Sequence, residues 1–136
     1  MDPSQILDKA PLVLALLVFS IFAYLYFGSK KKAQIEQDKV PLLQEQCGGR
    51  FDSLNLTIPF VRHAIYEDFI IIAYGHKKIV IKYKELKNVV FSKFIISKGI
   101  SYLHSNPELP SSIIVWTLSY DKALRILRQK NVRIEV

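Results

Sequence analysis

A chain of 136 residues has room for one ordinary domain and an appendage, because domains cluster around roughly 100 to 150 residues. Half of the residues are apolar and the formal net charge is +7, which suits an anionic membrane surface or a nucleic acid but also occurs in soluble domains without a charged partner. The single cysteine, Cys47, excludes an intramolecular disulfide and a thiolate metal cluster, in agreement with a reducing compartment.

Residues 10–29 form an apolar segment without a charged side chain. As an α-helix this segment rises about 30 Å, the thickness of a bilayer hydrocarbon core. Aromatic and basic residues gather at its C-terminal end: Tyr24, Tyr26, Phe27, Lys30, Lys31 and Lys32. Aromatic rings at headgroup level followed by lysines are typical of the cytoplasmic end of a membrane helix. We therefore predict a transmembrane helix at residues 10–29, with residues 1–9 outside the cell and the rest in the cytosol.

A cleaved signal peptide and a buried core helix are the two alternatives for this segment. A signal peptide begins with basic residues and ends at a small-residue site, whereas this chain begins with Asp2 and the segment ends in aromatic residues. A core helix that is apolar on every face would be long for so small a domain. Because the segment holds no ionisable side chain, it offers no proton or ion pathway, and we expect an anchor.

Residues 30–49 are expected to form a juxtamembrane linker. Helix-forming residues dominate its first part, and Pro41 should end any helix near Lys39. Cys47, Gly48 and Gly49 would then provide a flexible joint before a folded domain at residues 50–136.

From residue 50 onward the pattern is that of β-strands. Alternating or continuous apolar runs predict about seven strands, at residues 51–58, 61–66, 69–74, 79–83, 88–95, 100–104 and 112–117. We expect turns at residues 75–78 and 97–99 and a loop at residues 106–110. Ser119 is a suitable N-cap for one amphipathic helix that ends near Asn131, and residues 132–136 would form an extended tail.

Strands followed by a single helix indicate a bent antiparallel sheet, or a partly open barrel, whose open end the helix plugs. With the hairpin of residues 65–72 and the passage from Trp116 to Asp121 into the helix, this order resembles the pleckstrin-homology-like (PH-like) superfold, particularly the small PH-like domains beside membrane helices in bacterial proteins. The resemblance covers roughly residues 50–136 and rests on element order. It implies a bacterial inner (cytoplasmic) membrane. A different antiparallel sheet with a helix is the alternative.

No catalytic residue, cofactor or metal is predicted. His63, His76 and His104 each lack a second ligand at metal-binding spacing, and we expect them to be exposed or hydrogen-bonded structural residues. The chain has no nucleophile motif and no glycine-rich phosphate loop. Aromatic and basic residues do not interleave as they do in RNA-binding strands, so we expect no nucleic-acid partner.

Basic residues are the only potentially functional side chains that lie close together in the sequence. Four lysines on or near one predicted hairpin are candidates for contact with lipid phosphates: Lys77, Lys78, Lys82 and Lys84. Each such charge near an anionic leaflet contributes about 1 kcal/mol. The alternative is a solvated strand face that keeps the sheet soluble. The region of the first hairpin offers Arg50 and Arg62 without the basic triplet of phosphoinositide-binding PH domains, so that specificity is not expected.

These observations predict a membrane-anchored, non-enzymatic binding or scaffolding module. The lipid bilayer and a protein or peptide are its expected partners, and a sheet edge or the open end of the barrel would hold the latter at the cytosolic membrane face. A sensor of anionic lipid that works through the hairpin lysines is the alternative, and an enzyme with an unrecognised site is the least favoured one.

Overall fold

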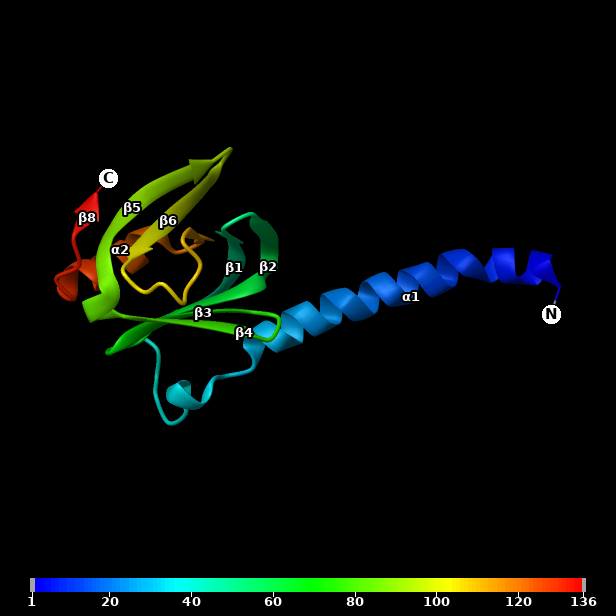
Figure 1. Cartoon of the computed structure of the whole chain (residues 1–136), viewed down its shortest axis with the longest axis horizontal. Helices are drawn as coiled ribbons and strands as arrows, with labels where there is room; N and C mark the ends of the chain where they lie inside the picture. The colour runs from blue at the N-terminus through cyan, green and yellow to red at the C-terminus, as the bar shows by residue number, and fades with distance from the viewer. Residues whose placement is uncertain (1, 136) are drawn as a thin grey trace.

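A computed structural model describes residues 2–135 and divides them into a long helix and a mainly-β domain (Figure 1). Helix α1 (Pro3–Lys30) leads into the 3-10 helix η1 (Gln34–Glu36). The strands are β1 (Leu43–Phe51), β2 (Leu54–Ile65), β3 (Phe69–Tyr74), β4 (Lys77–Lys82), β5 (Leu86–Phe94), β6 (Ser97–His104), β7 (Ile113–Trp116) and β8 (Ile134–Glu135). The 3-10 helix η2 (Tyr83–Glu85) separates β4 from β5, and helix α2 (Tyr120–Gln129) follows β7.

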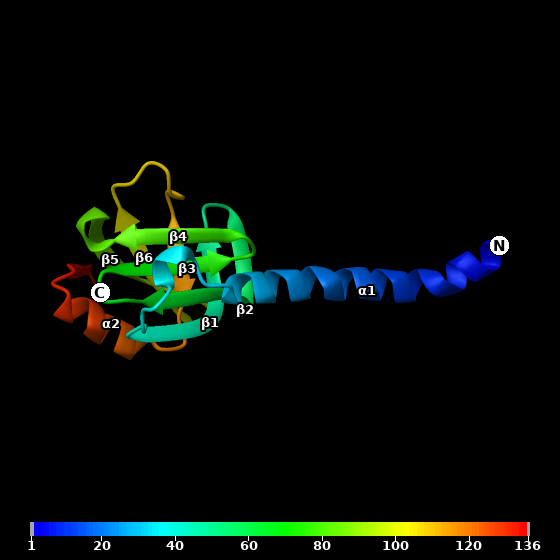
Figure 2. The same cartoon turned by 90° about the horizontal axis from the view of Figure 1, so that it is seen from below.

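The eight strands form one sheet in the order β4-β3-β2-β1-β7-β6-β5-β8. Neighbouring strands are antiparallel except β5 and β8, which are parallel. The sheet curls into a half-barrel in which β1 joins the β2–β4 half to the β5–β7 half (Figure 1). Helix α2 lies on the side of the domain away from α1, as Figure 2 also shows. One curled sheet with one C-terminal helix confirms the predicted fold class, with eight strands instead of about seven, and is compatible with a PH-like fold.

The hydrophobic core fills the inside of the half-barrel. β3 is buried along its whole length because Ile70 and Ile72 point into the core while Phe69 and Ile71 belong to a second apolar cluster on the other face. β4 alternates, as a strand with one covered face should. Helix α2 closes the core with one apolar face, made of Ala123, Leu124, Ile126 and Leu127.

The predicted flexible joint before the domain was wrong. Cys47, Gly48 and Gly49 lie inside β1, paired with β2 on one side and β7 on the other. The sheet therefore begins at Leu43, within the segment predicted as linker. The strand predicted at residues 51–58 has the wrong bounds, because Asp52 and Ser53 form a turn and β2 begins at Leu54 and runs on without a break to Ile65.

The turn between β5 and β6 differs from the prediction as well. It lies on Ile95 and Ile96 instead of residues 97–99, since Phe94 pairs with Ser97 and Lys93 pairs with Lys98. The two isoleucines thus occupy the tip of a hairpin.

Helix α1 lies outside the domain and touches it only through its C-terminal part (Figure 2). Its apolar window is not buried anywhere in the domain, so the core-helix alternative is wrong. The helix is long and apolar enough to cross a membrane, a property that a signal sequence near an N-terminus shares.

Candidate membrane-proximal binding surface

Two cations from the sheet bind the C-terminal carbonyls of α1. The last carbonyls of a helix have no partner inside the helix and carry the negative end of its dipole. Lys78 on β4 donates from Nζ to the carbonyl of Gly28 over 2.7 Å. Arg62 on β2 donates from Nε to the carbonyl of Ser29 over 2.7 Å and from Nη2 to that of Lys31 over 3.4 Å. The domain therefore caps its own N-terminal helix.

A buried carboxylate completes this junction. Glu36 on η1 accepts hydrogen bonds from Nη1 and Nη2 of Arg62 over 2.5 and 2.8 Å, from the Tyr66 hydroxyl over 2.9 Å and from the Ala33 N–H over 2.7 Å. Burial raises the pKa of Glu36, but these hydrogen bonds, led by that of Arg62, outweigh burial and hold the pKa below its ordinary value. Burial and the neighbouring carboxylate raise the pKa of Tyr66 to about 12, so its hydroxyl stays a donor. We call Glu36, Arg62, Tyr66 and Lys78 the junction clamp.

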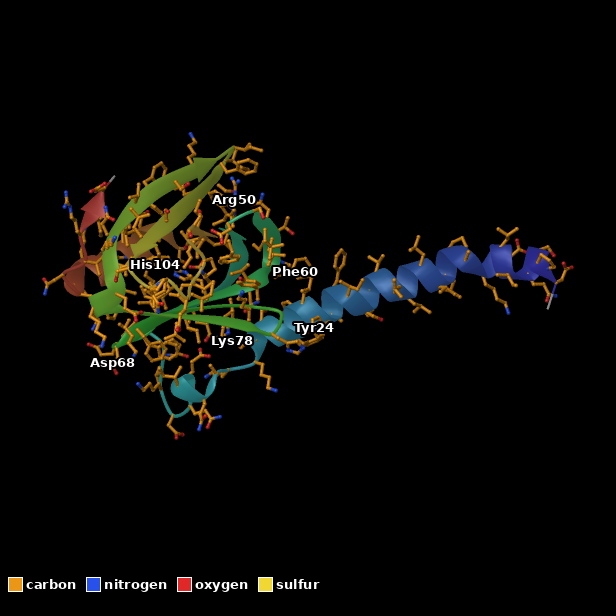
Figure 3. All side chains as sticks on the ribbon, viewed as in Figure 1. Tyr24, Arg50, Phe60, Asp68, Lys78 and His104 are labelled. Atoms are coloured by element: carbon orange, nitrogen blue, oxygen red, sulfur yellow. The ribbon has the colours of Figure 1, made fainter. Side chains whose placement is uncertain are left out.

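Aromatic and backbone contacts flank the clamp. Phe22 on α1 packs against Phe60 on β2 at a centroid distance of 5.3 Å, and Tyr24 meets His76 edge to face at 4.6 Å. Figure 3 shows Tyr24, Phe60 and Lys78 gathered where the helix meets the domain. Gly28 allows this approach, because a Cβ built on it would lie 2.7 Å from the carbonyl oxygen of Gly75.

We expect Gly28→Ala to loosen this junction. Alanine favours the helix itself by about 1 kcal/mol over glycine, so any loss of order must come from the clash with the Gly75 backbone. Hydrogen exchange of the full-length protein should show faster exchange at His76 and Lys77. Ser20→Ala, on the exposed part of α1, should leave that exchange unchanged. Equal protection in both variants would contradict the close contact.

The predicted anchor residues all lie at or near this junction. Lys30 places its Nζ 4.5 Å from the centroid of the Tyr26 ring, and Phe27 is exposed on the helix surface. The side chains of Lys31 and Lys32 are exposed just after the helix end. The domain surface around Phe60 and His76 therefore lies level with the aromatic end of α1.

The four predicted lipid-contacting lysines are not brought together. Lys77 and Lys78 begin β4 beside α1, whereas Lys82 ends that strand and Lys84 lies in η2 beyond it. Lys77 and Lys82, at the two ends of this strand, lie roughly 17 Å apart. Burial is the main cause that lowers the pKa of Lys78 below its ordinary value, and its Nζ is bound to the helix. Lys77 and Lys82 are exposed.

β4 is an edge strand with free backbone groups. Within residues 2–135 it pairs with β3 alone, while the other edge of the sheet is the two-residue β8. Ladder hydrogen bonds alternate along antiparallel strands, and the two-residue turn after Tyr74 makes Tyr74 and Lys77 a bonded pair. The N–H and C=O groups of Lys78, Val80 and Lys82 therefore point to the open edge. Consistently, the Lys82 N–H donates to a side chain, Glu85, over 3.3 Å.

A second feature is an apolar groove of about 360 Å³ between β2 and the β5–β6 hairpin. Trp116 and Gly48 line it together with Leu56, Ile58 and Phe94. The Phe94 and Trp116 rings lie 5.8 Å apart, centroid to centroid. Beyond the groove, the hairpin tip exposes three large apolar side chains in succession.

The interior of the half-barrel holds a polar network. His63 lies between Tyr102, 2.7 Å from Nε2, and Glu45, 3.3 Å from Nδ1, and Glu45 also accepts from Thr117 and from the Leu118 N–H. Burial raises the pKa of Tyr102 well above its ordinary value, because the phenol has no water to solvate its anion. The network is satisfied internally, and no buried side-chain polar atom in the described part of the chain lacks a partner.

Cys47 is the one thiol that the sequence offers as a nucleophile or a metal ligand. Cys47 is fully buried, and burial raises the pKa of its thiol, so it is a structural core residue and not a linker thiol. Among residues 2–135 no group of three or more His, Cys, Asp or Glu side chains could hold a metal ion.

Sequence reasoning missed the junction clamp, the free edge and the hairpin tip. An arginine within an apolar strand and an isolated glutamate in a polar segment were the only local signals for the clamp, and neither identifies its partner. Comparison of the chain with protein-family models and with curated proteins finds no match.

Proposed function

We propose that this protein is a membrane-anchored, non-enzymatic binding module that holds a protein partner at the cytosolic face of a membrane. In this proposal α1 spans the bilayer with residues 1–9 outside and the half-barrel inside, as the lysines after the helix favour. The exposed apolar surface of α1 supports the span, since an apolar helix outside any protein core needs another apolar environment.

The observation that carries the proposal is the combination of a clamped helix and an open strand edge. The junction clamp gives the domain one orientation relative to α1, and β4 begins at that junction. An extended segment can therefore add to β4 close to the membrane surface and at a defined angle. Addition of a strand to a free sheet edge is a general mode of peptide recognition.

The side chains along this edge favour an acidic partner segment. The exposed lysines on β4 and just after it are Lys77, Lys82 and Lys84. Lys39 lies beside Lys82 and Lys84, at the C-terminal end of the strand. Asp68 pairs with Lys39 over 3.3 Å at an exposed position, where an ion pair contributes little and can be exchanged. We infer an extended peptide with acidic side chains as the ligand class.

The experiment places a photo-cross-linking amino acid at Lys82 in the full-length protein in its native cells. A proline at Val80 removes one outward N–H without breaking the β3 ladder, and Val80→Ala removes a similar part of the side chain but keeps the N–H. Loss of one main-chain hydrogen bond and the leftover unpaired carbonyl should weaken the cross-link to the partner roughly tenfold in Val80→Pro relative to Val80→Ala.

Equal cross-linking in the two variants would contradict strand addition at β4. The anchor is tested in the same cells: carbonate washing should leave the protein in the membrane, and protease added outside intact cells should spare the half-barrel. Release by carbonate, or digestion of the half-barrel from outside, would contradict the proposed topology.

The second candidate function, a sensor of anionic lipid, is favoured by the position of Lys77. Its side chain is exposed at the β3–β4 turn, next to the aromatic end of α1. Lys82 and Lys84 lie away from this turn, so fewer than the four predicted lysines would contact the membrane. The strand edge therefore remains our first choice.

A further inference from the structure

The tip of the β5–β6 hairpin is the most exposed apolar feature of the domain. Phe94, Ile95 and Ile96 are 59%, 75% and 92% exposed, so all three present apolar surface to solvent and Ile96 stands almost entirely in it. Single exposed apolar residues are common, but three large ones in sequence on a protruding hairpin mark an interaction site.

The backbone at this tip is strained for the residues it carries. Ile95 has φ of 55°, a left-handed conformation that a β-branched residue rarely adopts. Two-residue hairpin turns favour Asn-Gly or a glycine at such a position. An Ile-Ile turn therefore gives up local stability and keeps two large apolar side chains at the outermost point of the hairpin.

The outer part of the β5–β6 hairpin stands free of the rest of the sheet. β6 pairs with β7 only at Ile100 and Ser101 among the described residues, so the outer part of the hairpin has no support from β7. Figure 1 shows its tip on the side of the domain from which α1 leaves. Ile58 at the near side of the groove is also exposed, and Phe60 two residues later packs on α1, so apolar surface continues from the helix toward the hairpin.

The charges behind the tip suit a lipid headgroup layer. No acidic residue occurs between Leu86 and His104, and the hairpin carries lysines. Lys93 and Lys98 pair across the two strands directly behind the apolar tip, with Lys98 Nζ 5.6 Å from the Tyr120 ring centroid. Apolar side chains followed by lysines form the order in which interfacial segments enter an anionic membrane.

We infer that the β5–β6 hairpin is a second membrane contact. Phe94, Ile95 and Ile96 enter the boundary between headgroups and acyl chains of the bilayer that α1 crosses, and Lys93 and Lys98 lie at the lipid phosphates. This inference rests on the proposed membrane span of α1 and is independent of the partner at β4. With two attachments, the helix and the hairpin, the half-barrel is held at the membrane surface.

The test uses the full-length protein reconstituted into vesicles of phosphatidylcholine and phosphatidylglycerol. An environment-sensitive fluorophore is attached to a cysteine introduced by Ile96→Cys, while the native Cys47 is buried and protected from labelling. We expect a blue shift of emission and quenching by lipids brominated in the upper acyl chain. The same fluorophore on Gln129→Cys, at the exposed far end of α2, should stay unquenched with aqueous emission.

A second comparison avoids variants that fail to fold. The fluorophore is placed at Ser97→Cys, and the tip is changed by Ile95→Gly together with Ile96→Asn, because of these two residues only Ile95 has a positive φ and glycine suits that first position of the turn. The changed tip should raise the urea midpoint of unfolding and abolish the quenching that the native tip shows at this position.

Three outcomes would overturn the inference. One is aqueous, unquenched emission at residue 96 in a protein that floats with the vesicles and resists carbonate, which leaves the anchor intact. Another is a blue shift that increases with the protein density in the vesicles and is not accompanied by quenching by brominated lipid. That result would indicate that a second copy of the protein covers the tip. The third is a change of tip that leaves quenching unaltered. Release of the whole protein by carbonate would instead contradict the proposed span of α1.

Discussion

Replacing Arg62 by methionine is expected to lower the free energy of unfolding by about 3–5 kcal/mol, as removal of one partner from a buried ion pair does. Arg62 is 1% exposed and Glu36 0%, so water cannot solvate the remaining carboxylate while the junction stays closed. The carbonyls of Ser29 and Lys31 lose a donor at the same time. Urea unfolding of the full-length protein in detergent micelles, followed by the fluorescence of Trp116, measures the change.

Arg50→Met is the matched control for this prediction. Arg50 is exposed and donates to the carbonyl of Asp52, so its replacement should change stability by no more than about 0.5 kcal/mol. Changing Glu36 and Arg62 together to methionine removes both charges and should cost less than Arg62→Met alone. A loss below about 1 kcal/mol for Arg62→Met would mean that the pair behaves as a solvated surface pair and would contradict the clamp.

Changing Glu45 to alanine is expected to cost about 3 kcal/mol, because three donors lose their acceptor and each unpaired buried group costs about 1–3 kcal/mol, less where water enters the space. These donors are His63 Nδ1, the Thr117 hydroxyl and the Leu118 N–H. Glu45→Gln keeps an acceptor oxygen and should cost less. Gln44→Ala, at the exposed neighbouring position, should change little. A loss as small as that of Gln44→Ala would contradict the structural role of the network.

The same carboxylate should make the domain sensitive to acid. Burial raises the pKa of Glu45, but the hydrogen bonds from His63 and Thr117 and the His63 charge hold it below its ordinary value of 4.5. A carboxylate with a lowered pKa stabilises the fold at pH values above its ordinary pKa. This contribution to stability is lost as the pH falls through the pKa of the folded state. Urea midpoints should therefore decrease between neutral pH and about pH 3, and decrease less in Glu45→Ala. An equal decrease in both proteins would assign acid sensitivity elsewhere, Glu36 first.

Elements with a strong local pattern were predicted from the sequence. The apolar run of α1, the continuous apolar stretch of β3 and the helical spacing of α2 each have one favoured structure, and all three are present. β1 was missed because Gln44, Glu45 and Gln46 are polar and two glycines follow. Its polar residues include Glu45, which serves the interior network, so the strand lacks the alternation by which strands are recognised.

The functional surface was harder to predict because its contacts are distant in sequence. Arg62 is separated by 26 residues from Glu36 and by 33 from Ser29, and no local periodicity reports such pairs. The hairpin tip was missed for a different reason. Turn preferences favour the Ser-Lys-Gly segment at residues 97–99, and the chain instead places its turn on Ile95 and Ile96, against those preferences. Departure from a local rule is expected where function selects the residues.

The junction clamp between α1 and the sheet also couples the orientation of the domain to the thickness of the membrane. The apolar segment of α1 is about 30 Å long and matches an ordinary hydrocarbon core, but in a thinner bilayer such a helix tilts to keep its apolar surface in lipid. Arg62 and Lys78 hold the domain to the end of the helix in one orientation. When α1 tilts in the bilayer, the half-barrel therefore rotates with it. A thinner bilayer would turn the edge of β4 to a new height above the lipid.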